Sequence, residues 1–101
     1  MKAKTEKWEQ AGFCGVDAGL IWIGDPCYII GQDATEQPAE SWSDFCKQIE
    51  NMGASQQFKY KHGHDGLGVC IGDFGGDGCY SVYVKKDSNG RVLEAKIVFS
   101  E

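Results

Sequence analysis

The alternation of polar and apolar residues over 79–100 limits the fold more than any other part of this sequence. In "CYSVYVKK", Tyr80, Val82 and Val84 would share one face of a strand, and the same period returns in "RVLEAKIVF". The two runs are joined by "DSNG" at 87–90, and Asn-Gly is the strongest short-range hairpin signal. We therefore predict an antiparallel hairpin over 79–100.

Shorter runs upstream predict additional strands. Residues 20–23, "LIWI", and 67–71, "LGVCI", are continuous apolar runs of the kind that forms fully buried strands. Residues 57–61, "QFKYK", alternate strictly, and residues 28–30 should resume an extended run after the turn at Pro26.

One segment, 39–52, has the spacing of an amphipathic helix. Ser41 followed by Asp44 resembles a capping box, and Gly53 suits a C-terminal stop. The apolar stripe consists of Trp42, Phe45, Cys46, Ile49 and Met52. The predicted fold class is therefore α+β, mainly an antiparallel β-sandwich or partly open barrel with one helix (about 39–52) packed on it.

A chain of 101 residues, 42% of them apolar, is expected to form a single domain over 1–101, with residues 1–10 as a candidate flexible tail. The formal net charge is −5 and the basic residues are scattered, which argues against nucleic-acid binding. The N-terminal lysines precede an apolar run too short for a signal peptide, and no run approaches the roughly 20 apolar residues of a membrane span. We expect a cytoplasmic protein with no membrane partner.

The cysteines also indicate a reducing compartment. They are odd in number and lie in apolar contexts, at Cys14, Cys27, Cys46, Cys70 and Cys79. This pattern favours free, buried thiols over disulfides.

A short motif occurs twice, as "GDPCYII" at 24–30 and "GDGCYSV" at 76–82. In both copies a Gly-Asp turn should lead into a strand that begins Cys-Tyr, with the Asp side chain closing the turn. If the copies lie symmetrically, Asp25, Tyr28, Asp77 and Tyr80 would line one binding surface. Five matching positions do not decide between a true repeat and shared turn chemistry.

Acidic turns and two histidines suggest a metal site. Asp73 and Asp77 match two positions of a calcium-binding EF-hand loop, but the other main ligands are missing, so only a looser oxygen site that includes Asp25 stays open. His62 and His64 would point to one side of an extended segment, as paired metal ligands do, although an exposed polar hairpin tip is the simpler interpretation. The candidate metal ligands are Asp73, Asp77, His62 and His64.

The segments "VDAGLIWIGDPCYII" (16–30) and "GDGCYSVYVKKDSNGRVLEAKIVF" (76–99) resemble a group of short, functionally uncharacterised proteins from bacteria and their phages. Members of this group look alike in a Gly-Asp-Pro-Cys-Tyr turn near the N-terminus and a C-terminal Gly-x-Tyr-x-Val hairpin. The resemblance leaves the helical middle out. It implies a small β-rich fold and no particular activity.

These observations favour a non-catalytic cytoplasmic binding or interaction protein over an enzyme, and no catalytic residue is assigned. In one form of this hypothesis the protein is phage-borne and acts on a host protein or a small metabolite; the acidic charge favours a basic protein partner. Two alternatives stay open. One is a metal-assisted hydrolase using the Asp and His turns; no cofactor is expected apart from a divalent metal in this alternative. The other is a structural homo-oligomer joined through an edge strand or an aromatic patch containing Trp8 and Trp22.

Overall fold

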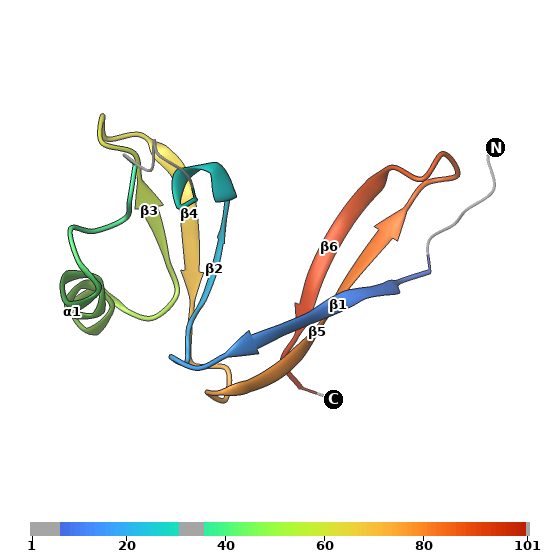
Figure 1. Ribbon diagram of the computed structural model, residues 1–101, viewed down its shortest axis with the longest axis horizontal. Coiled ribbons are helices and arrows are strands. Elements are labelled where there is room, and N and C mark those ends of the chain that lie inside the picture. Colours follow the sequence, from blue (N-terminus) through green and yellow to red (C-terminus); the bar gives the residue numbers. More distant parts are fainter. Residues whose placement is uncertain (1–6, 31–35, 101) are drawn as a thin grey trace. The chain divides into compact units, whose positions relative to one another are not determined.

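The computed structural model describes residues 7–30 and 36–100, which form two separate antiparallel sheets and one α-helix (Figure 1). The first sheet has the order β1-β5-β6 and the second the order β2-β4-β3. The strands are β1 (Glu9–Val16), β2 (Ile21–Gly24), β3 (Gln56–Lys59), β4 (Asp65–Ile71), β5 (Gly78–Lys86) and β6 (Val92–Val98), and the helix is α1 (Trp42–Met52). The α+β class is confirmed, and in the described residues neither sheet closes into a barrel.

The chain divides into two compact units. Residues 19–76 form one of them, called here the middle unit, which contains β2, α1, β3 and β4. The residues on either side, up to Ala18 and from Asp77 onward, form the other, called here the terminal unit.

The sheet of the terminal unit contains the predicted hairpin. β5 and β6 pair from Ser81 opposite Val98 to Lys86 opposite Val92. The turn between them is closed by Asp87, whose Oδ1 accepts the backbone N–H groups of Asn89 and Arg91 at 2.9 and 3.0 Å. The hairpin prediction is therefore confirmed.

The third strand of this sheet is β1. It pairs with β5 from Glu9 opposite Val84 to Val16 opposite Gly78, with a bulge between Gln10 and Gly12. Glu9 and Gln10 belong to the candidate flexible tail 1–10, yet both are strand residues; residues 1–6 lie outside the described part. Alternation in β1 is weakened by its two glycines, which is why the sequence pattern shows this strand poorly.

The core of the middle unit forms between its sheet and α1. Phe45, Phe58, Leu67 and Cys70 are its buried members. The helix begins one residue after Ser41, whose hydroxyl accepts the backbone N–H of Asp44 at 3.1 Å, and it stops at Gly53, where φ is +104°. The predicted cap and stop are both confirmed, although the helix itself is shorter than the predicted 39–52.

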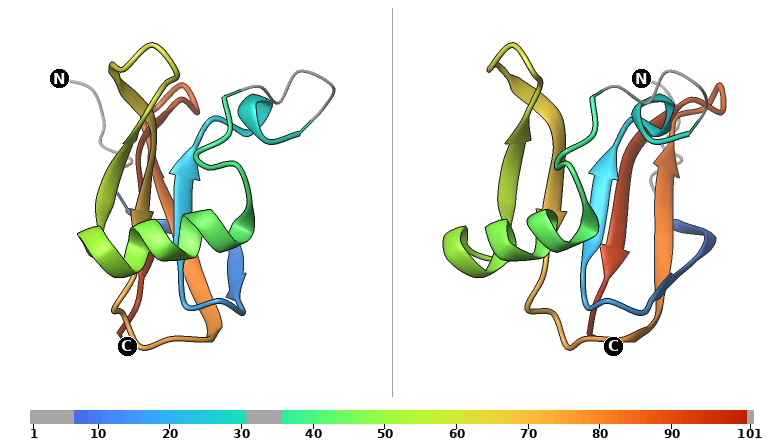
Figure 2. Two further views of the ribbon diagram at one scale, coloured as in Figure 1. Left: turned by 90° about the vertical axis from the view of Figure 1, so that its left-hand side faces the viewer. Right: turned by 60° about the vertical axis from the view of Figure 1, so that its left-hand side comes forward.

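The predicted apolar stripe of α1 is only partly covered. Phe45 is buried and Ile49 packs against the core, whereas Trp42 and Met52 are exposed. Figure 2 shows α1 running across the strands of its sheet. Three strands about 4.8 Å apart span about 10 Å between the outer two, and an 11-residue helix is about 16 Å long. The two ends of the helix therefore overhang the sheet.

Two strand predictions in this unit are wrong. In β2 only Ile21 is buried, Trp22 is half-buried and Ile23 is exposed, because β2 is a four-residue edge strand rather than a central one. The expected extended run over 28–30 is absent, since Pro26–Tyr28 form a turn of 3-10 helix, η1. Proline suits the first position of a helical turn, and here it redirects the chain out of the sheet.

All five cysteines are free, as expected, but only Cys70 is buried. Cys27 and Cys79, the thiols of the doubled motif, are exposed. Among the described residues, no helix is long and apolar enough to cross a membrane.

Candidate binding site

The first copy of the doubled motif is a structural corner of the middle unit. Its Gly24 lies opposite Gly68 on β4, and the indole of Trp22 covers both glycines. A Cβ atom on either glycine would come within 2.6 Å of an atom of that indole. The motif therefore begins with glycine because Trp22 occupies the space of a side chain.

Asp25 then starts the turn. Its Oδ1 accepts the backbone N–H of Cys27 at 3.0 Å, as an N-cap residue does for a helix. This hydrogen bond lowers the pKa of the Asp25 carboxyl. Asp25 also hydrogen-bonds to the Cys27 thiol and thereby raises the pKa of that thiol, which opposes thiolate formation and a nucleophilic role.

The second copy of the motif is built differently. Gly78, Cys79 and Tyr80 are the first residues of β5, as predicted, and the Tyr80 ring packs edge-on against Phe99 with centroids 5.5 Å apart. The expectation that both copies lead directly into a strand is therefore wrong for the first copy. The predicted binding residues are divided accordingly: Asp25 and Tyr28 belong to the middle unit, and Asp77 and Tyr80 to the terminal unit.

Tyr28 joins an aromatic cluster that also contains Tyr60 and His64. The rings of Tyr28 and Tyr60 meet edge-to-face at 5.5 Å, and those of Tyr60 and His64 stack at 4.4 Å. A hydrogen bond to Tyr60, together with that neighbour's charge, raises the pKa of Tyr28 to about 12. Tyr60 was not predicted as a site residue, although its position four residues before His64, across "KHG", is a usable signal for cross-strand neighbours.

The histidines of this cluster lie in a tight hairpin loop. The Tyr60 N–H donates to the carbonyl oxygen of His64 at 2.9 Å, and Gly63 adopts a φ of +96°. The expected extended arrangement of His62 and His64 is therefore wrong, and the simpler interpretation, an exposed hairpin tip, is confirmed.

The four candidate metal ligands are distributed over both units. His62, His64 and Asp73 are in the middle unit, whereas Asp77 is in the terminal unit. Asp73 has a φ of +60°, a left-handed conformation that Asp tolerates in turns. In the part of the chain that the structure describes, no three His, Cys, Asp or Glu side chains gather so that they could hold a metal ion.

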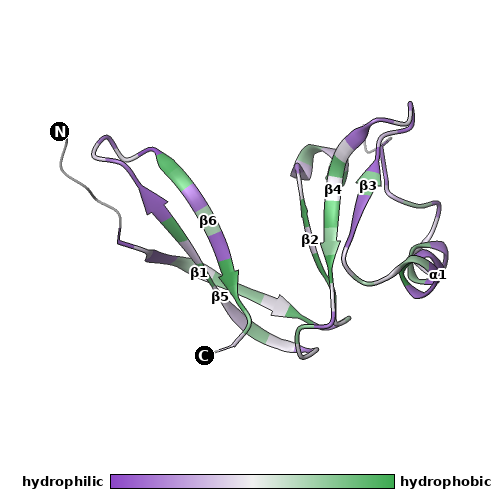
Figure 3. Ribbon diagram, turned by 180° about the vertical axis from the view of Figure 1, so that it is seen from behind, coloured by the Kyte–Doolittle hydropathy of each residue, from purple (hydrophilic) through white to green (hydrophobic). Residues whose placement is uncertain are grey.

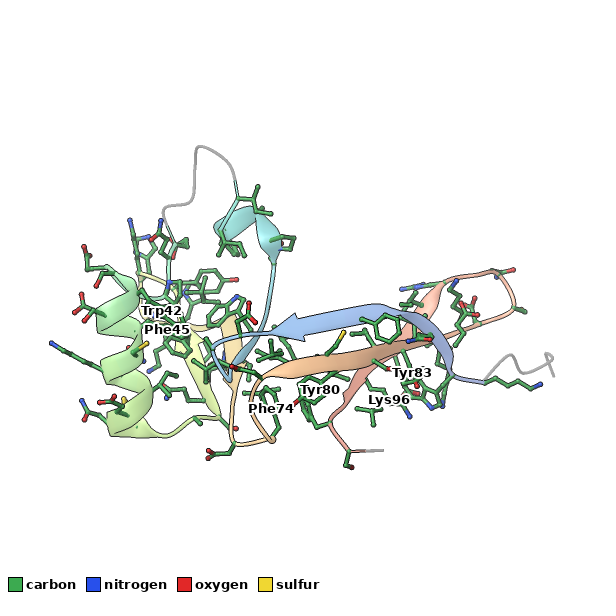
Figure 4. All side chains as sticks on the ribbon, turned by 60° about the horizontal axis from the view of Figure 1, so that its bottom comes forward. Trp42, Phe45, Phe74, Tyr80, Tyr83 and Lys96 are labelled. Atoms are coloured by element: carbon green, nitrogen blue, oxygen red, sulfur yellow. The ribbon has the colours of Figure 1, made fainter. Side chains whose placement is uncertain are left out.

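A stack of aromatic rings leads from the core of the middle unit to its surface. Phe58 stacks on Phe45 with centroids 5.2 Å apart, and Phe45 stacks on Trp42 at 5.6 Å; both pairs have an interplanar angle of 21°. Figure 4 labels Trp42 and Phe45 side by side on α1. Trp42 nevertheless remains 61% exposed. The indole is thus held in place from behind while much of its surface faces solvent.

Two acidic residues flank Trp42 in the sequence. Glu40 and Asp44 lie two residues to either side and are exposed. Residues 19–76 contain eight acidic and three basic residues, whereas the flanking residues contain seven of each. The whole net charge of −5 therefore belongs to the middle unit. Trp42 was predicted only as part of the apolar stripe of the helix. Its position in the first turn was the sequence feature that indicated exposure.

Comparisons with protein-family models, curated proteins and solved structures returned no match to this chain. The resemblance stated from the Gly-Asp-Pro-Cys-Tyr turn stays a prediction.

Proposed function

We propose that this is a non-catalytic, cytoplasmic binding protein whose middle unit holds a basic segment of a protein partner. The observation that supports the proposal best is Trp42, an exposed indole already fixed against Phe45. Tryptophan is enriched among the residues that dominate protein interfaces. Because its ring is already stacked, binding would cost little of the side-chain entropy that a free ring would lose.

The chemistry around Trp42 favours a cationic ligand. An indole face attracts Lys or Arg through the cation–π interaction, and the exposed carboxylates of the same unit can pair with other cations of the ligand. The charge of −5 on the middle unit would also accelerate encounter with a basic surface. A host protein as the partner of a phage-borne protein is the form of the proposal that the sequence resemblance favours.

The test is a pull-down from bacterial lysate with the tagged protein, read by mass spectrometry, in parallel for wild type, Trp42→Ala and Met52→Ala. Met52 is the matched control, because it is an exposed apolar residue at the other end of the same helix. We expect a basic protein that is lost from Trp42→Ala and retained by Met52→Ala. Binding should also weaken as salt is raised.

Two outcomes would contradict the proposal. One is capture that is equal for all three proteins. The other is no captured protein together with a small molecule retained in native mass spectrometry or turnover in a hydrolase screen, which would favour the metabolite or the metal-assisted hydrolase alternative.

A further inference from the structure

β6 is an edge strand of the sheet of the terminal unit. In the order β1-β5-β6, β6 pairs only with β5, and no other described strand pairs with its opposite side. Every second residue of such an edge points its backbone N–H and C=O away from the sheet, which makes the edge a template for another strand. Figure 1 shows β6 in this position.

The sequence of β6 is complementary to itself in the antiparallel direction. Its residues are Val92, Leu93, Glu94, Ala95, Lys96, Ile97 and Val98. If two copies pair about a two-fold axis through Ala95, Glu94 of each copy lies opposite Lys96 of the other. In the same register Leu93 lies opposite Ile97, and Val92 lies opposite Val98. The two Glu94–Lys96 pairs at the centre lie within the part of β6 that pairs with β5 without interruption, whereas Val92 and Leu93 lie at its bulge.

Residues 92–96 of β6 are exposed, although the Nζ of Lys96 lies 4.1 Å from the centroid of the Trp8 ring within the chain. Glu94 and Lys96 are exposed, and Val92 and Leu93 are large apolar residues with about half of their surface in solvent. Figure 3 shows apolar residues at both ends of β6 and polar residues between them. Glu94 already pairs with Lys85 within the chain, but at 3.6 Å and with 58% of its side chain exposed. That carboxylate can therefore accept a second cation.

The other edges of the two sheets suit self-pairing less well. β1 is interrupted by its bulge after Gln10 and contains two glycines. β2 and β3 have four residues each. In β6 the single irregularity is at Leu93, between the partners of Lys85 and Lys86, and residues 94–98 pair with β5 without interruption.

From these observations we propose that two copies of the chain associate through β6, antiparallel and centred on Ala95, to form a continuous six-stranded sheet. Directly opposed residues on one face of an antiparallel pair are close enough for Glu94 and Lys96 to interact across the dyad, and symmetry makes this pair occur twice. The proposal does not depend on the function assigned to Trp42, which lies in the other unit.

The first test is sedimentation of wild type, Glu94→Lys, Lys96→Glu and the double variant over a range of concentrations. Each single variant places like charges opposite each other twice, so the dimer dissociation constant should rise about tenfold or more. The double variant restores opposite charges in the same register and should recover the dimer. Lys85→Gln is the matched control, because it removes the same intrachain ion pair as Glu94→Lys but leaves Glu94 in place.

The second test fixes the register without depending on charge. In Ala95→Cys the two new thiols would face each other across the dyad, at the separation that a disulfide requires. Mild oxidation should give a dimer whose cross-linked peptide joins position 95 to position 95. Leu93→Cys, which would face Ile97, should not give the symmetric cross-link.

A wild-type protein that stays monomeric at all concentrations would overturn the proposal. So would a dimer that Glu94→Lys leaves intact, or a cross-link pattern centred away from Ala95. Circular dichroism of each variant separates loss of pairing from loss of the fold.

Discussion

Gly68 lies directly against the indole of Trp22. A Cβ atom built on Gly68 would be 2.6 Å from Cε2 of that ring, closer than real Cβ atoms come to a neighbour. Trp22 in turn packs edge-to-face on Phe58 at 5.3 Å and on Phe45 at 6.2 Å. The glycine pair under this ring lets a four-residue edge strand contribute a tryptophan to the core.

Replacing that glycine should therefore destabilise the middle unit. Gly68→Ala forces Trp22 away from Phe58, and overpacking of this kind costs about 1–3 kcal/mol in the free energy of unfolding. Urea denaturation followed by tryptophan fluorescence measures the change. Gly15→Ala on β1 is the control, because a Cβ there meets nothing within 4 Å; equal losses in both variants would contradict the explanation.

The helix cap gives a second prediction. Ser41→Ala removes the acceptor for the Asp44 N–H and should lower the free energy of unfolding by about 1 kcal/mol. Ser41→Asn, which keeps a side-chain acceptor at this position, should leave the free energy of unfolding nearly unchanged. Thermal unfolding of both variants provides the measurement. Ser43→Ala is the control, because Ser43 lies in the first turn of the same helix but is not the cap. This variant should not lower the free energy of unfolding, since alanine is the better helix former.

Tyr28 should ionise unusually late. Its pKa of about 12 reflects the hydrogen bond to Tyr60, so one tyrosine in an absorbance titration at high pH should respond near 12 and disappear in Tyr28→Phe. The folded pKa lies above the ordinary value of about 10, so this hydrogen bond contributes its full stability below pH 10. The contribution is lost as the pH rises through about 12. If a tyrosine still ionises near pH 12 in Tyr28→Phe, the late ionisation does not belong to Tyr28 and the prediction is wrong.

Thiol reactivity tests the Asp25 corner. The Asp25 side chain raises the pKa of Cys27, so Asp25→Asn should increase the rate of alkylation of Cys27 severalfold at mildly alkaline pH. Asparagine can still accept the backbone N–H of Cys27, which preserves the turn. Peptide mapping by mass spectrometry separates Cys27 from exposed Cys79, whose rate serves as the internal reference. An unchanged rate at Cys27 would show that the carboxylate does not restrain this thiol.

The sequence predicted the elements whose signals are local. The Asn-Gly turn defined the hairpin of β5 and β6, and Ser41 and Gly53 defined the limits of α1. These features depend on backbone conformations that a few neighbouring residues determine.

It predicted poorly whatever depends on position within a sheet. "LIWI" reads as a buried strand, but β2 lies at an edge, which is decided by the pairing of β4 with both β2 and β3. The same holds for the candidate site. Tyr60 contacts both Tyr28 and His64, and Trp42 lies in the first turn of a helix that is longer than the sheet beneath it is wide, neither of which a single segment encodes.

The position of the middle unit in the chain has a consequence for the order of assembly. β1 and β5 pair with Val16 opposite Gly78, like the two arms of a hairpin, yet residues 19–76 separate them. Closing a loop of that length in a disordered chain carries an entropic penalty, and contacts between residues so distant in sequence form slowly. Once the intervening residues have collapsed into their own core, far less chain remains free between the two arms. We therefore expect the β1-β5-β6 sheet to be completed last, with the β5-β6 hairpin already formed before β1 pairs with β5.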